Sequence, residues 1–406
     1  MIRKFKLSVV AAHAALAAVM ALSVPASGSA AAAKSNAQSS GIQITMNGAE
    51  FKPNEAPFVK NGTVFLPLRD MGELLGSVVF WNGSAKTVTM TYPELTVQLN
   101  YGTQKATVNG KTKALTDSPR IVKGRIYVPL RFLSETTGAD VKWNASKRTV
   151  SIKHSQAFVK GTGVDSMFWL NRNTGDLYIA HPYEQKPVRA GKVEGKFEEF
   201  VSIHSYIAGS GDMVVTILDN YGEPHVHYAA YGVLVHGNKI VAQKKAKYFQ
   251  RYEENAVAYM VRDPKSNKSE ERLLLTDGKT LSVYDTQGKE IEKYDLPALG
   301  GKDETYAVLG AGEDYLVVRP NQTGLLTLIN LDDKTTVNLP EKLLKGEDLE
   351  YALNNDVPYH GDLLKYLGEE SAGGLLVFGY ESPFDNEGVK TYTYNRKTGE
   401  VAPAAK

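Results

Sequence analysis

Apolar and polar residues alternate in short runs through most of the chain, and near the N-terminus the runs repeat. LPLRDMGELLGSVVFWNGSAKTVTM, residues 66–90, is matched without a gap by VPLRFLSETTGADVKWNASKRTVSI, residues 128–152. The two stretches lie 62 residues apart and share eleven identical positions. Asn47-Gly48 and Gly62 also return, as Asn109-Gly110 and Gly124. The pattern predicts a unit of about sixty residues that occurs twice, at 42–92 and 104–153.

Each copy contains β-rich runs around one short helix. IQITMNG and ATVNG alternate like strands and stop at Asn-Gly, a pair that tolerates positive φ. TVFLPLR and RIYVPLR contain a proline, which can open a helix at its first turn. The helix that follows is predicted to close at Gly76 or Gly138, because glycine adopts the left-handed conformation most easily. With two further strands, each copy is predicted to be β-β-α-β-β, a helix laid over a small antiparallel sheet.

The tryptophan of each copy permits two interpretations. Trp81 and Trp143 occupy equivalent positions in alternating strands, which favours burial in the core. An exposed tryptophan could instead stack on a sugar ring. In each copy an arginine also precedes a glutamate by four residues, the spacing of a helical ion pair: Arg69 and Glu73, then Arg131 and Glu135. An anion-binding arginine is the alternative interpretation.

The combined pattern (L/V)PLR, (E)LLG, V-x-W and TV-x-I resembles the copper amine oxidase N-terminal domain. That domain is a small α/β stalk module, which many secreted proteins of Gram-positive bacteria carry beside unrelated domains. The resemblance covers Ile42 to about Ile152. It implies the fold of the stalk and an extracellular setting. In that family the stalk holds neither the copper nor the redox cofactor, so the resemblance alone does not imply amine oxidation.

From Val164 onward, short β-rich runs alternate with polar turns. Four runs have the strand, turn, strand pattern of β-hairpins: residues 170–175, 284–288, 329–334 and 394–399. Their spacing suits four-stranded propeller blades, and helical periodicity appears only near residues 340–355. We expect residues 164–406 to form an all-β domain of five blades, or six, that resembles degenerate propellers of secreted bacterial proteins. A pair of β-sandwiches is the alternative.

The N-terminus predicts export. Arg3, Lys4 and Lys6 precede an apolar run, Leu7–Val24, and a stretch rich in small residues, Pro25–Ala33. This is the pattern of a secretory signal peptide, residues 1–33, with a retained membrane anchor as the alternative. Residues 34–41 are predicted to be a flexible linker. We therefore expect a secreted protein, with cell-wall association as an option, and no integral membrane segment after cleavage.

The charge and the cysteine content of the chain limit the classes of partner that it can bind. Removing residues 1–33 leaves 44 Lys and Arg against 45 Asp and Glu, so no strong field would attract nucleic acid. The chain contains no cysteine, so neither a disulfide nor a lipid-modified thiol can be present. We expect the partner to be an unknown extracellular or cell-wall ligand, either a polysaccharide or a protein.

The sequence does not carry the motif of amine oxidase chemistry. That chemistry uses a tyrosine within Thr-x-x-Asn-Tyr-Asp/Glu, and TILDNYGEPHVHY offers Asn220-Tyr221. Thr216 is one residue too far away, and Gly222 stands where the acid should follow. The spacing therefore argues against the self-processing cofactor.

A metal site and other catalytic sites are equally weak in the sequence. His225 and His227 would point to one face of a strand and could hold a divalent ion, with only His204, His236 and His360 as remote helpers. No nucleophile elbow, zinc helix or phosphate loop appears. We predict no catalytic residue, no metal and no cofactor, and assign no ligand-binding residue. The predicted function is a non-catalytic interaction or envelope-associated protein; the alternative is a secreted, carbohydrate-active hydrolase with its site in the propeller channel.

Overall fold

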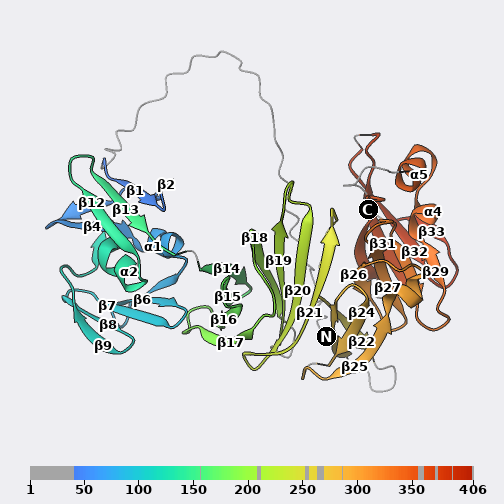
Figure 1. Ribbon diagram of the computed structural model, residues 1–406, viewed down its shortest axis with the longest axis horizontal. Helices are drawn as coiled ribbons and strands as arrows, with labels where there is room; N and C mark the ends of the chain where they lie inside the picture. Colours follow the sequence, from blue (N-terminus) through green and yellow to red (C-terminus); the bar gives the residue numbers. More distant parts are fainter. Residues whose placement is uncertain are drawn as a thin grey trace, which may run out of the picture. The chain divides into compact units, whose positions relative to one another are not determined.

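The computed structural model describes residues 41–406 except 156, 208–211, 252–255, 263–268, 286, 355–360, 371–373, 386 and 405–406. For residues 256–262 and 269–270 it describes the backbone alone. Strands dominate, and a few short helices accompany them (Figure 1). The predicted signal peptide and residues 34–40 of the predicted linker lie outside the described residues. None of the described helices is both long and apolar enough to cross a bilayer.

Residues 42–153, here called the repeat module, form three small sheets and two helices. Helix α1 spans Leu68–Leu75 and helix α2 spans Leu130–Thr136. The first sheet has the order β12-β13-β1-β2, from Asp140–Asn144, Thr149–Lys153, Gln43–Met46 and Ala49–Phe51. The second has the order β10-β11-β4-β3, from Arg120–Val122, Arg125–Pro129, Thr63–Pro67 and Phe58–Lys60. The third runs β5-β6-β7-β8-β9, from Val78–Asn82, Thr87–Tyr92, Leu95–Asn100, Lys105–Val108 and Lys111–Ala114.

Each of these sheets combines strands of both sequence copies. Strand β1 of the first copy pairs in parallel with β13 of the second, with Ile44 opposite Val150. Strands β4 and β11, which are equivalent in the two copies, pair antiparallel with Leu66 opposite Val128. Because these two residues also lie 62 positions apart, the pairing is symmetric about them. One continuous core includes buried residues of all three sheets and both helices. The copies are therefore interleaved, and neither has a core of its own.

The sequence of the repeat determines the local structure around each helix. Each helix begins directly after a proline, Pro67 or Pro129, which fixes φ without losing a needed donor. Gly76 closes α1 with φ 62°, as predicted. Helix α2 ends one residue earlier, at Thr136, and Gly138 still adopts a positive φ of 84°. Helix α1 packs on β4, β5 and β11, and α2 packs on β4 and β12.

Residues 158–403, here called the sheet series, form five four-stranded antiparallel sheets, each from consecutive strands. The first two contain β14 to β17 (Phe158–Gly163, Ser166–Asn171, Asp176–Ala180, Val188–Lys192) and β18 to β21 (Phe200–Ile207, Met213–Tyr221, His227–His236, Lys239–Phe249). The third contains β22 to β25 (Ala256–Arg262, Ser269–Thr276, Thr280–Tyr284, Glu290–Asp295). The last two contain β26 to β29 (Tyr306–Ala311, Tyr315–Pro320, Thr327–Asn330, Thr336–Asn338) and β30 to β33 (Lys365–Glu370, Leu375–Glu381, Val389–Asn395, Val401–Pro403). Three short helices accompany them: α3 Leu296–Gly300, α4 Leu339–Leu343 and α5 Gly346–Leu353.

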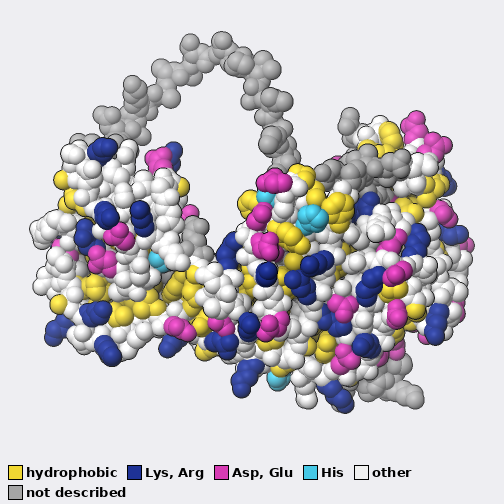
Figure 2. Space-filling view, viewed as in Figure 1, with side chains coloured by type: hydrophobic (Ala, Val, Ile, Leu, Met, Phe, Trp, Pro, Cys, Tyr) yellow, Lys and Arg dark blue, Asp and Glu magenta, His cyan; other side chains and the backbone are white. Residues whose placement is uncertain are grey.

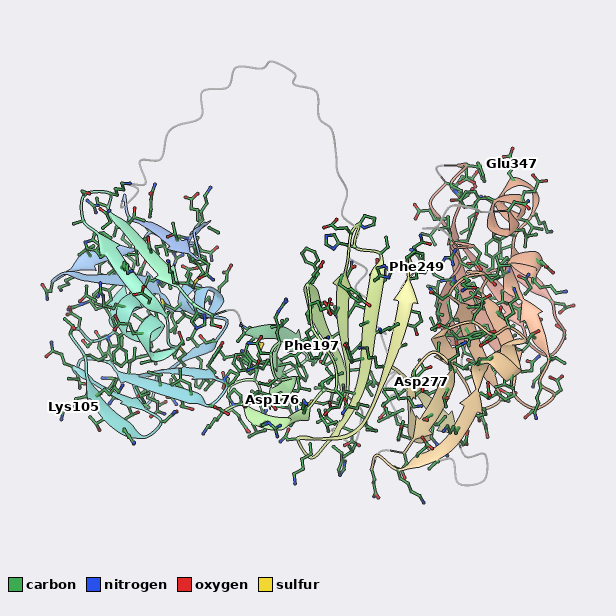
Figure 3. All side chains as sticks on the ribbon, viewed as in Figure 1. Lys105, Asp176, Phe197, Phe249, Asp277 and Glu347 are labelled. Carbon is green, nitrogen blue, oxygen red and sulfur yellow. The ribbon has the colours of Figure 1, made fainter. Side chains whose placement is uncertain are left out.

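Consecutive sheets of the series share apolar cores. Buried residues of β15, β16, β19 and β20 form the core between the first two sheets, together with Phe197 from the loop before β18 (Figure 3). Similar clusters join the second sheet to the third, the third to the fourth and the fourth to the fifth. The four predicted hairpin turns all connect paired strands, which confirms them. Asn171 and Asn395 hold two of these turns, because each side-chain oxygen accepts two backbone N–H bonds.

The repeat module packs against the first sheet of the series. Trp169 is fully buried, lies in a cluster with Val78 and Tyr178, and donates its indole N–H to Gly76 O at 2.7 Å. The Tyr178 hydroxyl donates to Glu94 Oε1 at 2.7 Å. Lys160 Nζ donates to Ser77 O at 3.2 Å, and burial lowers the pKa of Lys160. This contact, here called the seam, covers the face of the first sheet that points away from the second.

Two predictions about the fold are corrected. The order β-β-α-β-β omits two short strands before the helix in each copy, β2 and β3 in the first and β9 and β10 in the second. The expected single antiparallel sheet under each helix is also wrong, since strands are exchanged between the copies and β1 runs parallel to β13. The first sheet of the series begins at Phe158, six residues before the expected start of the second domain.

Candidate functional site

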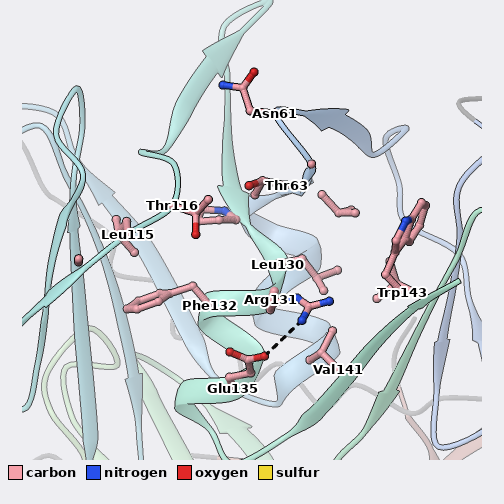
Figure 4. Close-up of a pocket in the computed structure, with 15 residues that line it drawn as sticks. Asn61, Thr63, Leu115, Thr116, Leu130, Arg131, Phe132, Glu135, Val141 and Trp143 are labelled. Atoms are coloured by element: carbon pink, nitrogen blue, oxygen red, sulfur yellow. Dashed lines mark ion pairs between the residues drawn. The ribbon is translucent and has the colours of Figure 1, made fainter. Parts of the chain in front are cut away.

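A cavity of about 330 Å³ lies in the repeat module beside the start of α2. We call it the Trp143 pocket. Its apolar lining includes Leu130, Phe132, Val141 and Trp143, and its polar lining comes from Asn61, Thr63, Thr116, Arg131 and Glu135. Figure 4 shows Phe132 and Trp143 on opposite sides of Arg131, which points toward Glu135. The pocket thus combines an aromatic surface with a few hydrogen-bonding groups.

The expectation that Trp143 is a core residue is wrong. Its side chain remains 36% exposed, and it is outside the buried core of the module. Trp81, the equivalent residue of the first copy, is half-buried against that core and meets Tyr101 edge-on at 6.2 Å between ring centroids. Tyr101 follows β7, and the first sheet of the module has no strand equivalent to β7. The missing neighbour explains why one tryptophan is covered and its equivalent is not.

The polar groups of the Trp143 pocket are already organised by the fold. Arg131 Nη1 and Glu135 Oε1 are 3.9 Å apart, one helical turn from each other, as the spacing predicted. Asn61 adopts φ 50° in the tight turn between β3 and β4, followed by Gly62 at φ 74°. This turn belongs to the first copy, while the helix belongs to the second. The pocket therefore exists only because the two copies are interleaved.

A second cavity, of about 790 Å³, lies at the equivalent place beside α1, and we call it the Trp81 pocket. Several of its lining residues occur 62 positions before those of the Trp143 pocket: Pro67, Leu68, Arg69, Val79 and Trp81. The exchanged turn is also equivalent, because Gly124, Arg125 and Ile126 replace Gly62, Thr63 and Val64. Tyr183, from the loop after β16, completes the lining. The interleaved copies thus form two related pockets.

The charges of the two pockets differ. In the Trp81 pocket, Arg125 forms an ion pair with Glu55. Asp70 is buried, and its Oδ1 accepts hydrogen bonds from the backbone N and the side-chain Nδ2 of Asn54. Arg69 is exposed, and within the described residues no ion pair joins it to Glu73 or to another acid. The predicted Arg69–Glu73 pair is therefore absent, whereas its equivalent in the second copy is present.

The histidines of the sheet series do not form the site that their spacing suggested. His225 lies in a turn with φ 64° rather than on a strand, and its Nδ1 is 2.9 Å from Glu199 Oε2. His227 begins β20 and stacks on Tyr221, 5.7 Å between centroids. The two rings therefore do not share one strand face, and that expectation is wrong. Within the described ranges, no group of three or more His, Asp or Glu side chains is placed to hold a metal ion.

Of the three histidines expected as remote helpers, His204 lies on β18 and His236 ends β20, both outside this turn. His236 Nδ1 is 2.6 Å from Asp212 Oδ1, His204 is exposed on β18, and His360 is outside the described residues. Apolar and histidine side chains gather at one end of the second sheet (Figure 2). Two exposed aromatic residues are among them. Phe200 is 64% exposed, and its ring centroid is 5.0 Å from that of His225. Phe249 is 48% exposed, and its ring centroid is 5.1 Å from that of His227.

A cavity of about 750 Å³ lies in the sheet series, among residues of its second, fourth and fifth sheets. Arg251, Arg319, Lys365 and Glu381 contribute the charges of its lining. Arg319 is held by buried Asp362, with Nη2 2.8 Å from Oδ1. Among the described residues that line this cavity, Glu381 is the one carboxylate.

Comparison with known proteins identifies part of the chain. Residues 45–152 match the family model of the copper amine oxidase N-terminal domain, which confirms the resemblance inferred from the motifs. A protease inhibitor of Brevibacillus choshinensis is 26% identical over 145 residues, which is 35% of this chain and 44% of the inhibitor. The chain therefore matches less than half of the length of that relative.

Two solved structures overlap larger parts of the chain at low similarity. A protein from Desulfotomaculum acetoxidans has 9% identity and a TM-score of 0.29, over 80% of this chain and 78% of its own. A protein of unknown function from Bacteroides caccae has 7% identity and a TM-score of 0.25, over 77% and 93%. Both values are too low to identify a fold or a function.

The sequence identified some pocket residues and missed others. Trp81, Trp143, Arg69 and Arg131 stand out because they recur 62 residues apart. Asn61, Thr63 and Thr116 carry no such signal, since they reach the Trp143 pocket from turns of distant strands. Asn61-Gly62 does predict a turn, but only the exchange of strands places that turn beside α2.

Proposed function

We propose that this protein is an exported, non-catalytic binding protein whose repeat module binds an extracellular polysaccharide at the Trp143 pocket. The observation that carries the proposal is the partial exposure of Trp143 in a cavity whose lining also contains several polar residues. An exposed indole at the edge of a stable sheet offers a flat apolar surface, which suits the C–H face of a pyranose ring. Buried tryptophans such as Trp169 do not offer such a surface.

The polar rim suits a neutral sugar. Arg131 and Glu135 satisfy each other's charge, and their remaining donors and acceptors can bind sugar hydroxyls. Asn61, Thr63 and Thr116 add uncharged groups of the same kind. Such sites combine an apolar wall with a few oriented polar groups, as small-molecule sites commonly do. The pocket volume of about 330 Å³ is in the range of one or two sugar rings.

The proposal also covers the export of the protein and the role of the sheet series. Residues 1–33 have the pattern of a signal peptide, which supports export and an extracellular ligand. Propeller blades are four-stranded meanders, and five such meanders follow one another in the sheet series. They support a propeller-like fold for the series, which would serve as a scaffold or as a second binding surface. The match of residues 45–152 to a stalk domain supports a non-catalytic role for the repeat module.

Binding of soluble oligosaccharides to the mature chain tests the proposal. Isothermal titration would use β-1,4-linked mannohexaose, cellohexaose and N-acetylchitohexaose. We expect at least one to bind and Trp143→Ala to weaken it by about tenfold, since one aromatic contact contributes roughly 1 kcal/mol or more. Trp169→Phe is the matched control, because Trp169 is fully buried away from the pocket. Equal affinity in Trp143→Ala, or no binding at millimolar concentration, would contradict the proposal.

The alternative, a carbohydrate-active hydrolase, would place its site in the cavity lined by Arg251, Arg319 and Glu381. Glu381→Gln separates the two functions. If the protein released reducing sugar from any of these hexasaccharides and Glu381→Gln abolished that release, the non-catalytic proposal would be wrong. We expect no release from the wild type over a day at micromolar protein.

A further inference from the structure

We propose that the Trp81 pocket is a second sugar subsite. It binds an acidic sugar unit of the polysaccharide, and Arg69 binds the carboxylate of that sugar. This inference rests on the proposed function and names the ligand class more closely, as a polysaccharide that contains uronic or similar carboxylate-bearing sugars. The inference is based on a comparison of the two pockets, which equivalent residues of the two copies line.

The symmetry of the module makes the Trp81 pocket a counterpart of the Trp143 pocket. The β4–β11 pairing relates the two copies, and it places the turn of each copy beside the helix of the other. Both pockets therefore contain a proline and a leucine at the helix start, an arginine one residue later and a tryptophan on the following strand. A ligand that repeats along its length can contact both places with the same type of residue.

The aromatic surface of the second pocket has a different composition. Trp81 is half-buried, with Tyr101 against its edge, and so offers less of its indole than Trp143. Tyr183 is 40% exposed and lines the same cavity, which adds an exposed aromatic ring. The volume, about 790 Å³ against about 330 Å³, is also large enough for a sugar ring.

The charge state of the arginine decides the ligand class. Arg131 Nη1 lies 3.9 Å from Glu135 Oε1, so an acid on the same helix partly offsets its charge at the surface. Arg69 occupies the equivalent position, is exposed at the cavity, and among the described residues has no ion-pair partner. Of the other charged residues in the lining, Arg125 pairs with Glu55, and Asp70 Oδ1 accepts from Asn54 while the buried Asp70 Oδ2 has no hydrogen-bond partner among the described residues. The cation that remains available to a ligand is thus that of Arg69.

A guanidinium is well suited to such a ligand. It donates parallel N–H bonds to both oxygens of a carboxylate, and these charge-assisted bonds are stronger than bonds between neutral groups. A neutral hydroxymethyl group at the same carbon would lose that contact. The Trp81 pocket should therefore distinguish a uronic acid from its parent sugar, while the Trp143 pocket should not.

A matched pair of ligands tests this difference. The β-1,4-linked mannohexaose and hexamannuronate differ only in oxidation at C6, from CH₂OH to COO⁻. Titration of the full mature chain at low ionic strength should show hexamannuronate binding about tenfold more tightly, the contribution of roughly one charge-assisted hydrogen-bond pair. The preference should shrink as salt is raised, because the contact is exposed.

The repeat supplies the control variant. Arg69→Gln should abolish the preference for hexamannuronate, whereas Arg131→Gln, the equivalent change in the other pocket, should preserve it. A preference that survives in Arg69→Gln, or equal affinity of the wild type for both sugars, would overturn the inference. Equal affinities that Trp143→Ala lowers together would leave the proposed function intact. Failure of both sugars and of the other hexasaccharides to bind would overturn the proposed function and this inference together.

Discussion

The repeat module and the sheet series are both composed of short strands, but they combine them in opposite ways. In the module, strands pair across about a hundred residues, as β1 does with β13, and the strands and both helices share one core. In the series, every sheet is a meander of neighbouring strands, and a separate cluster joins each pair of consecutive sheets. The difference teaches that sequence repetition need not mean structural independence. The copies of the clear repeat share one core, whereas the series, which has no clear repeat, forms each sheet from consecutive strands alone.

The seam between the two regions gives the largest expected effect. Trp169 is fully buried there, and its N–H bond to Gly76 O crosses from one region to the other. Trp169→Ala should cost about 3–5 kcal/mol of unfolding free energy, as large-to-small changes of buried aromatic residues do. Scanning calorimetry should then show the repeat module and the sheet series melting at different temperatures. Trp169→Phe, which keeps most of the packing, is the milder control. An unchanged profile in Trp169→Ala would mean that the seam couples the regions only weakly.

A pair of leucine substitutions tests the contrast itself. Leu66 and Leu376 are both fully buried, the first in the shared core of the module and the second in the cluster between the last two sheets. Each change to alanine should cost about 2–5 kcal/mol locally. Hydrogen exchange should rise throughout 42–153 in Leu66→Ala, but only from β26 onward in Leu376→Ala. Exchange confined to one copy of the repeat in Leu66→Ala would show that the copies are independent after all.

The two equivalent tryptophans should differ in their contribution to stability. Trp81 packs on the core and on Tyr101, so Trp81→Ala should cost about 2–3 kcal/mol. Trp143 is 36% exposed, and Trp143→Ala should cost only about 1 kcal/mol. Urea denaturation of both variants measures the difference. Equal costs would mean that the exposed indole contributes to the core in solution, and they would remove the basis of the Trp143 pocket as a binding surface.

Alkaline pH should lower the stability of the protein by weakening the seam, and we expect this effect to be smaller than those of the substitutions above. Burial raises the pKa of Tyr178 to about 12, with a further contribution from Glu94, and burial raises the pKa of Tyr92 to about 12. An unfolded tyrosine has a pKa near 10, so the folded protein holds these protons more tightly. The stabilisation is complete below about pH 10 and is lost as the pH rises through about 12. Melting temperatures from pH 9 to 12 measure this loss, and Tyr178→Phe should reduce it. Tyr101→Phe, at an exposed tyrosine, is the control, and an equal reduction there would contradict this assignment.

The sequence predicted the fold of the sheet series better than that of the repeat module. Local signals were sufficient for the hairpins of the series, because Asn171-Gly175 and Asn395-Gly399 define turns by their own hydrogen bonds. They were also sufficient for both module helices, which a proline opens and a glycine follows. The exchange of strands could not be predicted, since the alternating pattern of β1 does not specify which copy supplies its partner strand. Trp143 was misjudged for the same reason: its exposure depends on β7, a neighbour that only the other sheet possesses.

Metal removal should have the smallest effect, and it separates the family match from its best-known chemistry. The region that matches the copper amine oxidase N-terminal domain, residues 45–152, contains no histidine and no cysteine, so it offers copper neither an imidazole nor a thiolate. The histidines with the closest spacing, His225 and His227, lie in the other region, where one pairs with Glu199 and the other stacks on Tyr221. Two imidazoles that do not converge would bind copper weakly. Dialysis against a chelator should therefore change the melting temperature by less than about 1 °C, because a ligand stabilises only in proportion to its occupancy. Elemental analysis should find well under one copper per chain, and a quinone stain should be negative. One tightly held copper per chain, with staining lost in Tyr221→Phe, would show instead that the second region is an oxidase and that the non-catalytic proposal is wrong.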